Sequence, residues 1–170
     1  MAEYKGHLTK QVIDRVLAEY LGDPLRGLGF HRQGGGGTWR RESIPGRRET
    51  IKTTASKHGP VEGLGNRFGV EFQFEPWIRE VRPFGHLLMH LTPEQEAQFL
   101  SLDRRIAARL DRPEGYEDLW LPYSDRGSEA WWDFRCLDEE DVHAWGGFLQ
   151  PVITSSYRSW WAQKLPHLAG

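Results

Sequence analysis

The chain of 170 residues fits one ordinary domain, and its eight Trp, eight Phe and five Tyr supply the apolar area that a core needs without covalent cross-links. A net charge of −2 argues against a general nucleic-acid binder, and a single cysteine, Cys136, excludes an internal disulfide framework and a zinc site built on paired cysteines. No apolar run opens the chain and no stretch approaches the roughly 20 apolar residues of a membrane helix, so we expect a cytoplasmic protein that does not enter a membrane.

The first predicted elements are helical. Apolar residues recur every four positions near the N-terminus, at Leu8, Val12, Val16 and Tyr20. This spacing indicates the buried stripe of an amphipathic helix, with Thr9 expected as its cap and Gly22 as its end. Asp23 followed by Pro24 predicts a short second helix, because a cap residue and a first-turn proline are typical of a helix start.

The middle of the chain changes to the period of a strand. After the glycines at 34–37, strands are predicted over Thr38 to Glu42, Thr50 to Ser56 and Arg67 to Glu75, with a turn at 43–48. The last strand alternates most regularly. Its two faces are Phe68, Val70, Phe72 and Phe74, expected in the core, and Gly69, Glu71, Gln73 and Glu75, expected in water. One buried and one wet face predict an antiparallel sheet.

Loops and short strands dominate much of the second half. A proline and a glycine interrupt the stretch 76–90, which we expect to be a loop with a short strand near Leu87 to His90. The acidic segment 111–118 is predicted to be a loop. Leu119 to Tyr123 and Glu129 to Cys136 are predicted strands.

Two more helices are predicted, each with a start signal. Thr92 is the expected cap of the first, with Pro93 in its first turn and Gln95 completing a capping box. Asp138 is expected to cap the last helix, which Pro151 should kink. Because strands cluster instead of alternating with helices, the order predicts a single α+β domain: an antiparallel meander sheet of about four to five strands, with helices packed on one face.

Several short segments occur in a recognisable order. They are Leu-Arg-Gly-Leu-Gly-Phe-His-Arg from residue 25, Thr-Trp-Arg-Arg from 38, Thr-Ala-Ser-Lys from 54, Phe-Gly-Val-Glu-Phe-Gln-Phe from 68, and a late Trp-Trp pair before a capped terminal helix. This arrangement resembles the bacterial family catalogued as domain of unknown function 4304. The resemblance implies a compact α+β fold and brings no catalytic motif with it. Members of such small bacterial families are often suspected to be immunity proteins that bind a toxin.

The histidine and cysteine residues can each be interpreted as having a chemical role or a purely structural one. His86 and His90, with His58 earlier in the chain, could share a metal if the first two lay on one helix. On a strand they would lie about 13 Å apart, so no metal site and no cofactor are predicted. Cys136 alternates with two aromatic residues, which places its thiol in the core, where it is inert, instead of making it a nucleophile.

The polar side of the best strand also has two interpretations. Glu71 and Glu75, with Gln73 between them, could provide paired carboxylates for acid–base work on a concave sheet. A neighbouring strand that contributes Lys52 would instead turn them into cross-strand ion pairs on a solvated face, and this interpretation is preferred.

Charge is distributed unevenly along the chain. Basic residues concentrate in 26–57 and acidic residues in 111–141. Such polarity without a catalytic signature favours a non-enzymatic interaction domain, immunity-like, that binds a charged protein partner. Two alternatives stay open: a small-molecule binder or enzyme with an aromatic-lined pocket between sheet and helices, and nucleic-acid binding through the basic hairpin, which is the least favoured.

The pocket hypothesis assigns particular residues. Its aromatic lining is expected from Trp39, Phe72, Trp132 and Trp160. The full set of candidate ligand-binding residues is Trp39, Arg41, His58, Glu71, Gln73, Glu75 and Trp132.

Overall fold

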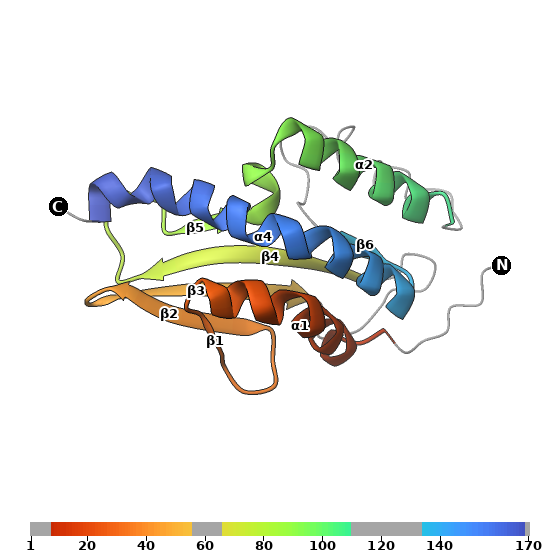
Figure 1. Ribbon diagram of the computed structural model, residues 1–170, viewed down its shortest axis with the longest axis horizontal. Helices are drawn as coiled ribbons and strands as arrows, with labels where there is room; N and C mark the ends of the chain where they lie inside the picture. The colour runs from red at the N-terminus through yellow and green to blue at the C-terminus, as the bar shows by residue number, and fades with distance from the viewer. Residues whose placement is uncertain (1–7, 56–65, 110–133, 169–170) are drawn as a thin grey trace.

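The computed structural model describes residues 8–55, 66–109 and 134–168. In these residues an antiparallel sheet carries α1 and α4 side by side on one face, and α2 lies beyond α4 (Figure 1). The predicted α+β architecture, with an antiparallel meander at its centre, is therefore confirmed. In the described part of the chain, no helix is long and apolar enough to span a bilayer.

The elements follow one another in a simple order. They are α1 (Lys10–Gly27), β1 (His31–Arg32), β2 (Thr38–Ile44), β3 (Arg47–Ala55), β4 (Asn66–Glu75), β5 (Phe84–His86), the 3-10 helix η1 (Leu87–His90), α2 (Pro93–Ala107), β6 (Phe134–Cys136) and α4 (Glu139–Leu168). Strands β1 to β5 pair in sequence order, and β6 joins the outer edge of β4 beyond β5.

Helix α1 continues through the proline that was expected to start a second helix. Pro24 lies inside the helix, and that prediction is wrong. Continuing the helix keeps Leu21 and Leu25 on one buried stripe, which outweighs the single backbone hydrogen bond that a proline removes near a helix end. The helix ends where Gly29 takes a φ of +90° and Phe30 N donates to Leu25 O at 2.9 Å.

The sheet has the predicted alternation except at Gly69, which was expected in water and is buried. The side chains of Phe68, Val70, Phe72 and Phe74 are buried against the helices, and Glu71, Gln73 and Glu75 lie on the opposite face. Strand β4 pairs with β3 from Phe68 to Glu75, with Phe72 opposite Ile51. The glycine turn is most constrained at Gly37, where a Cβ would fall 1.8 Å from Thr53 Oγ1; this hydroxyl donates to Asp14 of α1 at 2.7 Å.

The stretch 76–90 differs from its prediction. A strand forms at Phe84–His86, and the residues Leu87–His90 expected to form it make a 3-10 turn instead. The reason is tertiary, because Gly85 pairs with Phe72 of β4 and this pairing places the strand before the buried residues Leu87 and Leu88.

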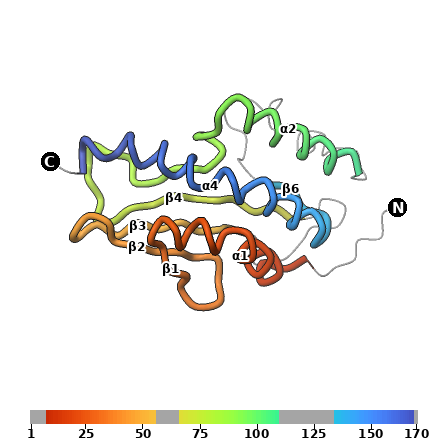
Figure 2. Tube along the Cα trace, viewed as in Figure 1, coloured from red at the N-terminus to blue at the C-terminus, as the bar shows by residue number. Residues whose placement is uncertain are grey.

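The C-terminal half brings the remaining elements together. Thr92 and Gln95 form the predicted capping box of α2, and Asp138 Oδ1 accepts from Asp141 N at 3.0 Å at the start of α4. Strand β6 forms at Phe134–Cys136, the described part of the strand predicted over Glu129 to Cys136, and the strand expected at Leu119 to Tyr123 lies outside the described residues. Figure 2 follows α4 along the sheet, with β6 beside its N-terminal part and η1 beside its C-terminal part.

Candidate functional site

Two of the predicted site residues lie on the helix-covered face of the sheet. Trp39 is 3% exposed and belongs to the core. Arg41 is held in a network: its Nε donates to Glu49 Oε1 at 3.1 Å and its Nη2 to the Tyr157 hydroxyl at 3.2 Å. Its guanidinium also lies over the rings of Phe30 and Tyr157, at 4.8 and 5.0 Å from their centroids. Arg41 therefore stabilises the packing of α4 on the sheet.

Glu49, at 0% exposure, is the centre of this network. It also accepts the hydroxyl of Ser43 at 2.6 Å and the Ser43 amide at 3.0 Å, which compensates for burying its charge. Burial, and next the charge of Glu49, raise the pKa of Tyr157 well above its usual value, so this phenol stays neutral. The cluster is a saturated structural network.

The polar face of the sheet pairs its charges across strands. Glu71 lies 3.7 Å from Lys52 and accepts from Gln73 Nε2 at 3.3 Å. Glu75 pairs with Arg48 on the neighbouring strand. The two carboxylates stand four residues apart on one strand, roughly 13 Å by strand rise, which is too far for joint acid–base work. The geometry matches the interpretation as cross-strand ion pairs.

Other candidates are placed differently or lie outside the described residues. His58 and Trp132 lie outside them, as does most of the acidic stretch 111–141. Phe72, expected to line a pocket between sheet and helices, is fully buried in the core. Cys136 is also buried, and burial raises its pKa well above the usual value, with Asp141 and Asp138 adding to the effect. This thiol is not an activated nucleophile.

A small pocket opens at the outer edge of β5, beside the C-terminal turns of α4. We call it the basic pocket; its volume is about 130 Å³, and it is lined by Arg82, Phe84, Gly85, His86, Met89, His90, Trp160, Gln163 and Lys164. Four of these nine residues are basic and none is acidic. His86 and His90 are the two histidines whose spacing raised the possibility of a shared metal. With Arg82 and Lys164 beside them, the site disfavours a cation and favours an anion.

The cations of the basic pocket act on one another. Burial, and then the charge of Arg82, lower the pKa of Lys164. Burial, and then the charge of Lys164, lower the pKa of His90. Within the part of the chain that the structure describes, neither Arg82 nor Lys164 forms an ion pair. Like charges are therefore gathered here without a compensating carboxylate.

The wall of the basic pocket holds a buried donor without a partner. Trp160 is 1% exposed, and its indole Nε1 makes no hydrogen bond. The nitrogen lies against Gly85, another lining residue, where a Cβ would fall 2.3 Å from it. Buried N–H groups are nearly always hydrogen-bonded, and leaving one unsatisfied costs about 1–3 kcal/mol. An acceptor entering the pocket would satisfy it.

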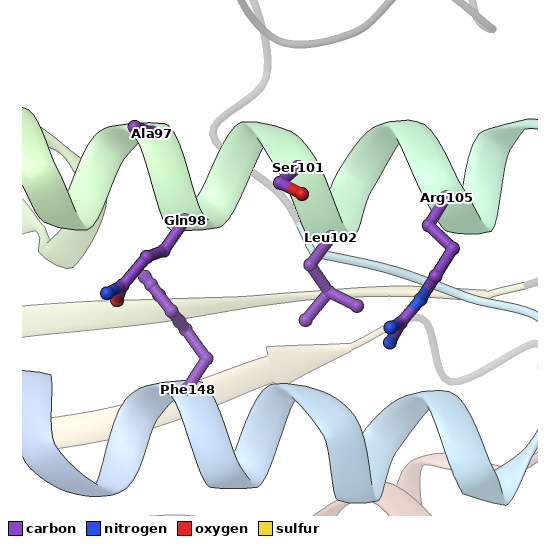
Figure 3. A pocket seen from close by; sticks show the side chains of 6 residues that line it. All are labelled: Ala97, Gln98, Ser101, Leu102, Arg105 and Phe148. Atoms are coloured by element: carbon purple, nitrogen blue, oxygen red, sulfur yellow. The ribbon is translucent and has the colours of Figure 1, made fainter.

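A second cavity, of about 540 Å³, lies between α2 and α4. Figure 3 shows Gln98, Leu102 and Arg105 of α2 pointing toward α4, and Phe148 of α4 rising toward α2. This groove is lined by both polar and apolar side chains. Among the described residues that line it, none has a buried donor without a partner. It is larger than the basic pocket but has no comparable convergence of polar groups.

Comparison with known proteins adds no further constraint. No family model, curated protein or solved structure matches this chain. The resemblance to domain of unknown function 4304, the immunity-like role and the charged protein partner therefore stay predictions.

Sequence reasoning missed the basic pocket because its two walls are far apart in the chain. One wall comes from 82–90 and the other from 160–164. The available signal was a set of four basic residues, Arg82, His86, His90 and Lys164, each in a segment without an adjacent acidic residue. Only the pairing of β5 with β4 shows that they converge.

Proposed function

We propose that this protein binds a small anionic group, a phosphate or a carboxylate, in the basic pocket. The observation that carries the proposal is the unpartnered indole N–H of the buried Trp160 in a wall that also presents Arg82 and Lys164. An anion would accept from the indole and neutralise the two side-chain charges. Charge-assisted hydrogen bonds of this kind are roughly twice as strong as neutral ones.

The size of the pocket supports a small group. At about 30 Å³ per water, 130 Å³ holds roughly four water molecules. Pockets for drug-sized molecules are larger, at about 300–1,000 Å³. The basic pocket therefore has room for the anionic end of a ligand, and the remainder of such a ligand would extend onto the rim.

The chemistry of the lining supports binding and not catalysis. Its ionisable side chains are an arginine, a lysine and two histidines, and the nine residues include no carboxylate, hydroxyl or thiol. A serine, cysteine or carboxylate nucleophile is therefore not present in this lining. Donors that converge on one small volume are typical of an oxyanion receptor.

Calorimetric titration with inorganic phosphate tests the proposal. We expect a Kd on the order of 1 mM for the wild type, equivalent to about −4 kcal/mol, and at least a fivefold weaker affinity for Arg82→Gln. The matched control is Arg79→Gln, because Arg79 is an exposed arginine nearby that does not line the pocket. Equal phosphate affinity in Arg82→Gln and Arg79→Gln would reject the site.

A spectroscopic measurement locates the anion independently. In proton–nitrogen correlation spectra, phosphate should move the indole signal of Trp160 more than those of the other tryptophans, because a new hydrogen bond deshields its proton. The signal is assigned from its loss in Trp160→Phe. If phosphate binds but leaves this signal unmoved, the indole is not one of the donors.

A further inference from the structure

Large apolar side chains are exposed around the mouth of the basic pocket. Trp77 is 70% exposed, Met89 is 55% exposed and Phe84 is 44% exposed. Phe84 and Met89 line the pocket itself. The rings of Trp77 and Phe84 meet edge to face, with centroids 6.3 Å apart and an interplanar angle of 77°. We call this ring pair the aromatic platform; it continues the pocket outward from Phe84.

The turn that carries Trp77 is anchored by backbone contacts. Val81 N donates to Ile78 O at 3.0 Å, which closes the turn, and Arg47 Nη1 donates to Pro76 O at 3.0 Å from the neighbouring hairpin. These contacts anchor the backbone on both sides of Trp77, whose exposed indole meets the ring of Phe84. An exposed aromatic side chain on a fixed turn is a feature of binding surfaces.

We propose that the ligand of the basic pocket is a nucleoside monophosphate, with its phosphate in the pocket and its base stacked on the aromatic platform. This inference rests on the proposed function and adds to it the part of the ligand that lies outside the pocket. Aromatic side chains bind nucleobases because every base offers a π face, whatever its sequence identity. The platform and the pocket share Phe84, so one small molecule can contact both.

Size and charge favour a single nucleotide over a nucleic-acid chain. The pocket of about 130 Å³ has room for one terminal phosphate and not for a backbone passing through it. The chain as a whole carries a net charge of −2, which does not attract a polyanion. A simple acyl anion would occupy the pocket but would leave the flat faces of Trp77 and Phe84 unmatched.

The test compares ligands that share a phosphate and differ in the base. Calorimetric titrations with adenosine monophosphate, ribose 5-phosphate and inorganic phosphate are run on the wild type and on Trp77→Ala. We expect adenosine monophosphate to bind the wild type at least about tenfold more tightly than ribose 5-phosphate, the gain that one stacked base gives. Trp77→Ala should remove most of this gain and leave the affinity for ribose 5-phosphate within about twofold. Trp77 is exposed, so this variant is expected to fold.

Each outcome separates the two proposals. Equal affinities for adenosine monophosphate and ribose 5-phosphate in the wild type would overturn the nucleotide inference and leave the anion site standing. An unchanged nucleotide preference in Trp77→Ala would also overturn it, as would tighter binding of an alkyl phosphate of similar size. If no phosphate compound binds, the proposed function fails as well. Leu165→Ala, which removes an exposed apolar side chain outside the pocket, is the control and should change none of these affinities.

Discussion

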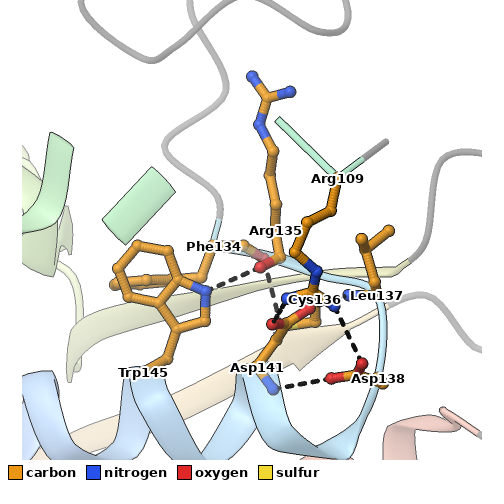
Figure 4. Close-up of polar contacts among 8 residues, drawn as sticks. All are labelled: Arg109, Phe134, Arg135, Cys136, Leu137, Asp138, Asp141 and Trp145. Atoms are coloured by element: carbon orange, nitrogen blue, oxygen red, sulfur yellow. Dashed lines mark hydrogen bonds and ion pairs between the residues drawn. The ribbon is translucent and has the colours of Figure 1, made fainter. Parts of the chain in front are cut away.

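The two ends of α4 differ in whether their polar side chains have hydrogen-bond or ion-pair partners. Near the N-terminal end, charges are paired by a shared arginine: Arg109 donates to Asp141 at 2.6 Å and to Asp138 at 3.0 Å (Figure 4). The indole of Trp145 donates to Arg135 O at 2.8 Å. At the C-terminal end, Trp160 has no acceptor, and Lys164 has no carboxylate in the described residues.

We call the N-terminal end of α4 the structural end, and its C-terminal end, at the basic pocket, the receptive end. Saturated polar groups lower the free energy of the folded chain and leave nothing for a ligand to bind. Polar groups without partners raise the free energy of the folded chain. A ligand that pairs with them lowers it again, which is why such groups concentrate at functional sites. Substitutions at the N-terminal end of α4 should therefore lower stability, and matched substitutions at the C-terminal end should lower binding instead.

The largest effect is expected at the paired end. Asp141→Ala removes a buried carboxylate that accepts from both Arg109 and the Leu137 amide, at 2.6 and 2.7 Å. We expect a loss of about 2–3 kcal/mol in the free energy of unfolding, measured by urea denaturation. Asp23→Ala, at an exposed ion pair on α1, is the control and should cost less than about 0.5 kcal/mol. Equal losses of stability in Asp141→Ala and Asp23→Ala would contradict the stabilising role of the paired charges at the N-terminal end of α4.

The two tryptophans sharpen the comparison. Trp145→Phe and Trp160→Phe remove similar buried ring area, but only the first breaks a hydrogen bond and leaves a carbonyl without its partner. Without ligand, Trp145→Phe should lower the free energy of unfolding by about 1–2 kcal/mol more than Trp160→Phe. Urea denaturation of both variants measures the difference. A larger loss in Trp160→Phe would show that its indole does make an important contact.

Titration of His90 should link stability to pH at the receptive end. Its pKa is lowered by burial and by Lys164, with Arg82 and His86 also lining its surroundings. The unfolded chain therefore binds the proton more readily, so stability falls as pH drops through the unfolded value of about 6.5. The effect stays below the ~1.4 kcal/mol per pH unit of one fully linked proton, since His90 is only half-buried.

Urea denaturation between pH 8 and 5 measures this linkage in the wild type and in His90→Gln. The free energy of unfolding of the variant should depend less steeply on pH. Phosphate favours the charged imidazole, so saturating phosphate should flatten the wild-type curve as well. Parallel curves for wild type and variant would remove His90 from the proton-linked group.

The smallest effect is expected from Lys164→Gln. Removing the charge of Lys164 leaves no carboxylate of the described residues without a partner. It also removes the repulsion between Lys164 and Arg82. We expect the free energy of unfolding to stay within about 0.5 kcal/mol of wild type or to rise slightly. Arg158→Gln, at an exposed position on the same helix outside the pocket, is the control. A loss above about 1 kcal/mol in Lys164→Gln alone would show that the receptive end is structural.

Local patterns predicted the fold well where one segment carried its own signal. The alternation along β4 predicted both faces of the central strand, and Thr92 with Gln95 predicted the start of α2. The prediction of a helix break at Pro24 was wrong because burial on a continuous stripe decided that position. Periodicity also could not locate β5, whose three residues are a strand only because β4 pairs with them.

The site was harder to predict than the fold. Trp160 lines the basic pocket and not the aromatic pocket expected between sheet and helices, whereas Trp39 is core and Arg41 is held by Glu49. Residue type alone does not distinguish these cases, since each is an aromatic or a basic side chain near the sheet. What distinguishes Arg41 from Trp160 is whether distant segments satisfy the polar atoms: Glu49 and Tyr157 pair with Arg41, whereas the indole N–H of Trp160 has no partner.

The outer edge of β4 is divided between two short strands, with β6 along Asn66–Phe68 and β5 along Glu71–Gln73. Because the two are held by separate sets of backbone bonds, β5 can detach while β6 stays in place. Short peripheral strands open at lower free energy than the centre of a sheet. Deuterium should therefore replace the amide protons of β5 sooner than those of β3, and a bound ligand should slow that exchange. On this expectation, the ligand that we propose for the basic pocket would enter and leave at one end without opening the core.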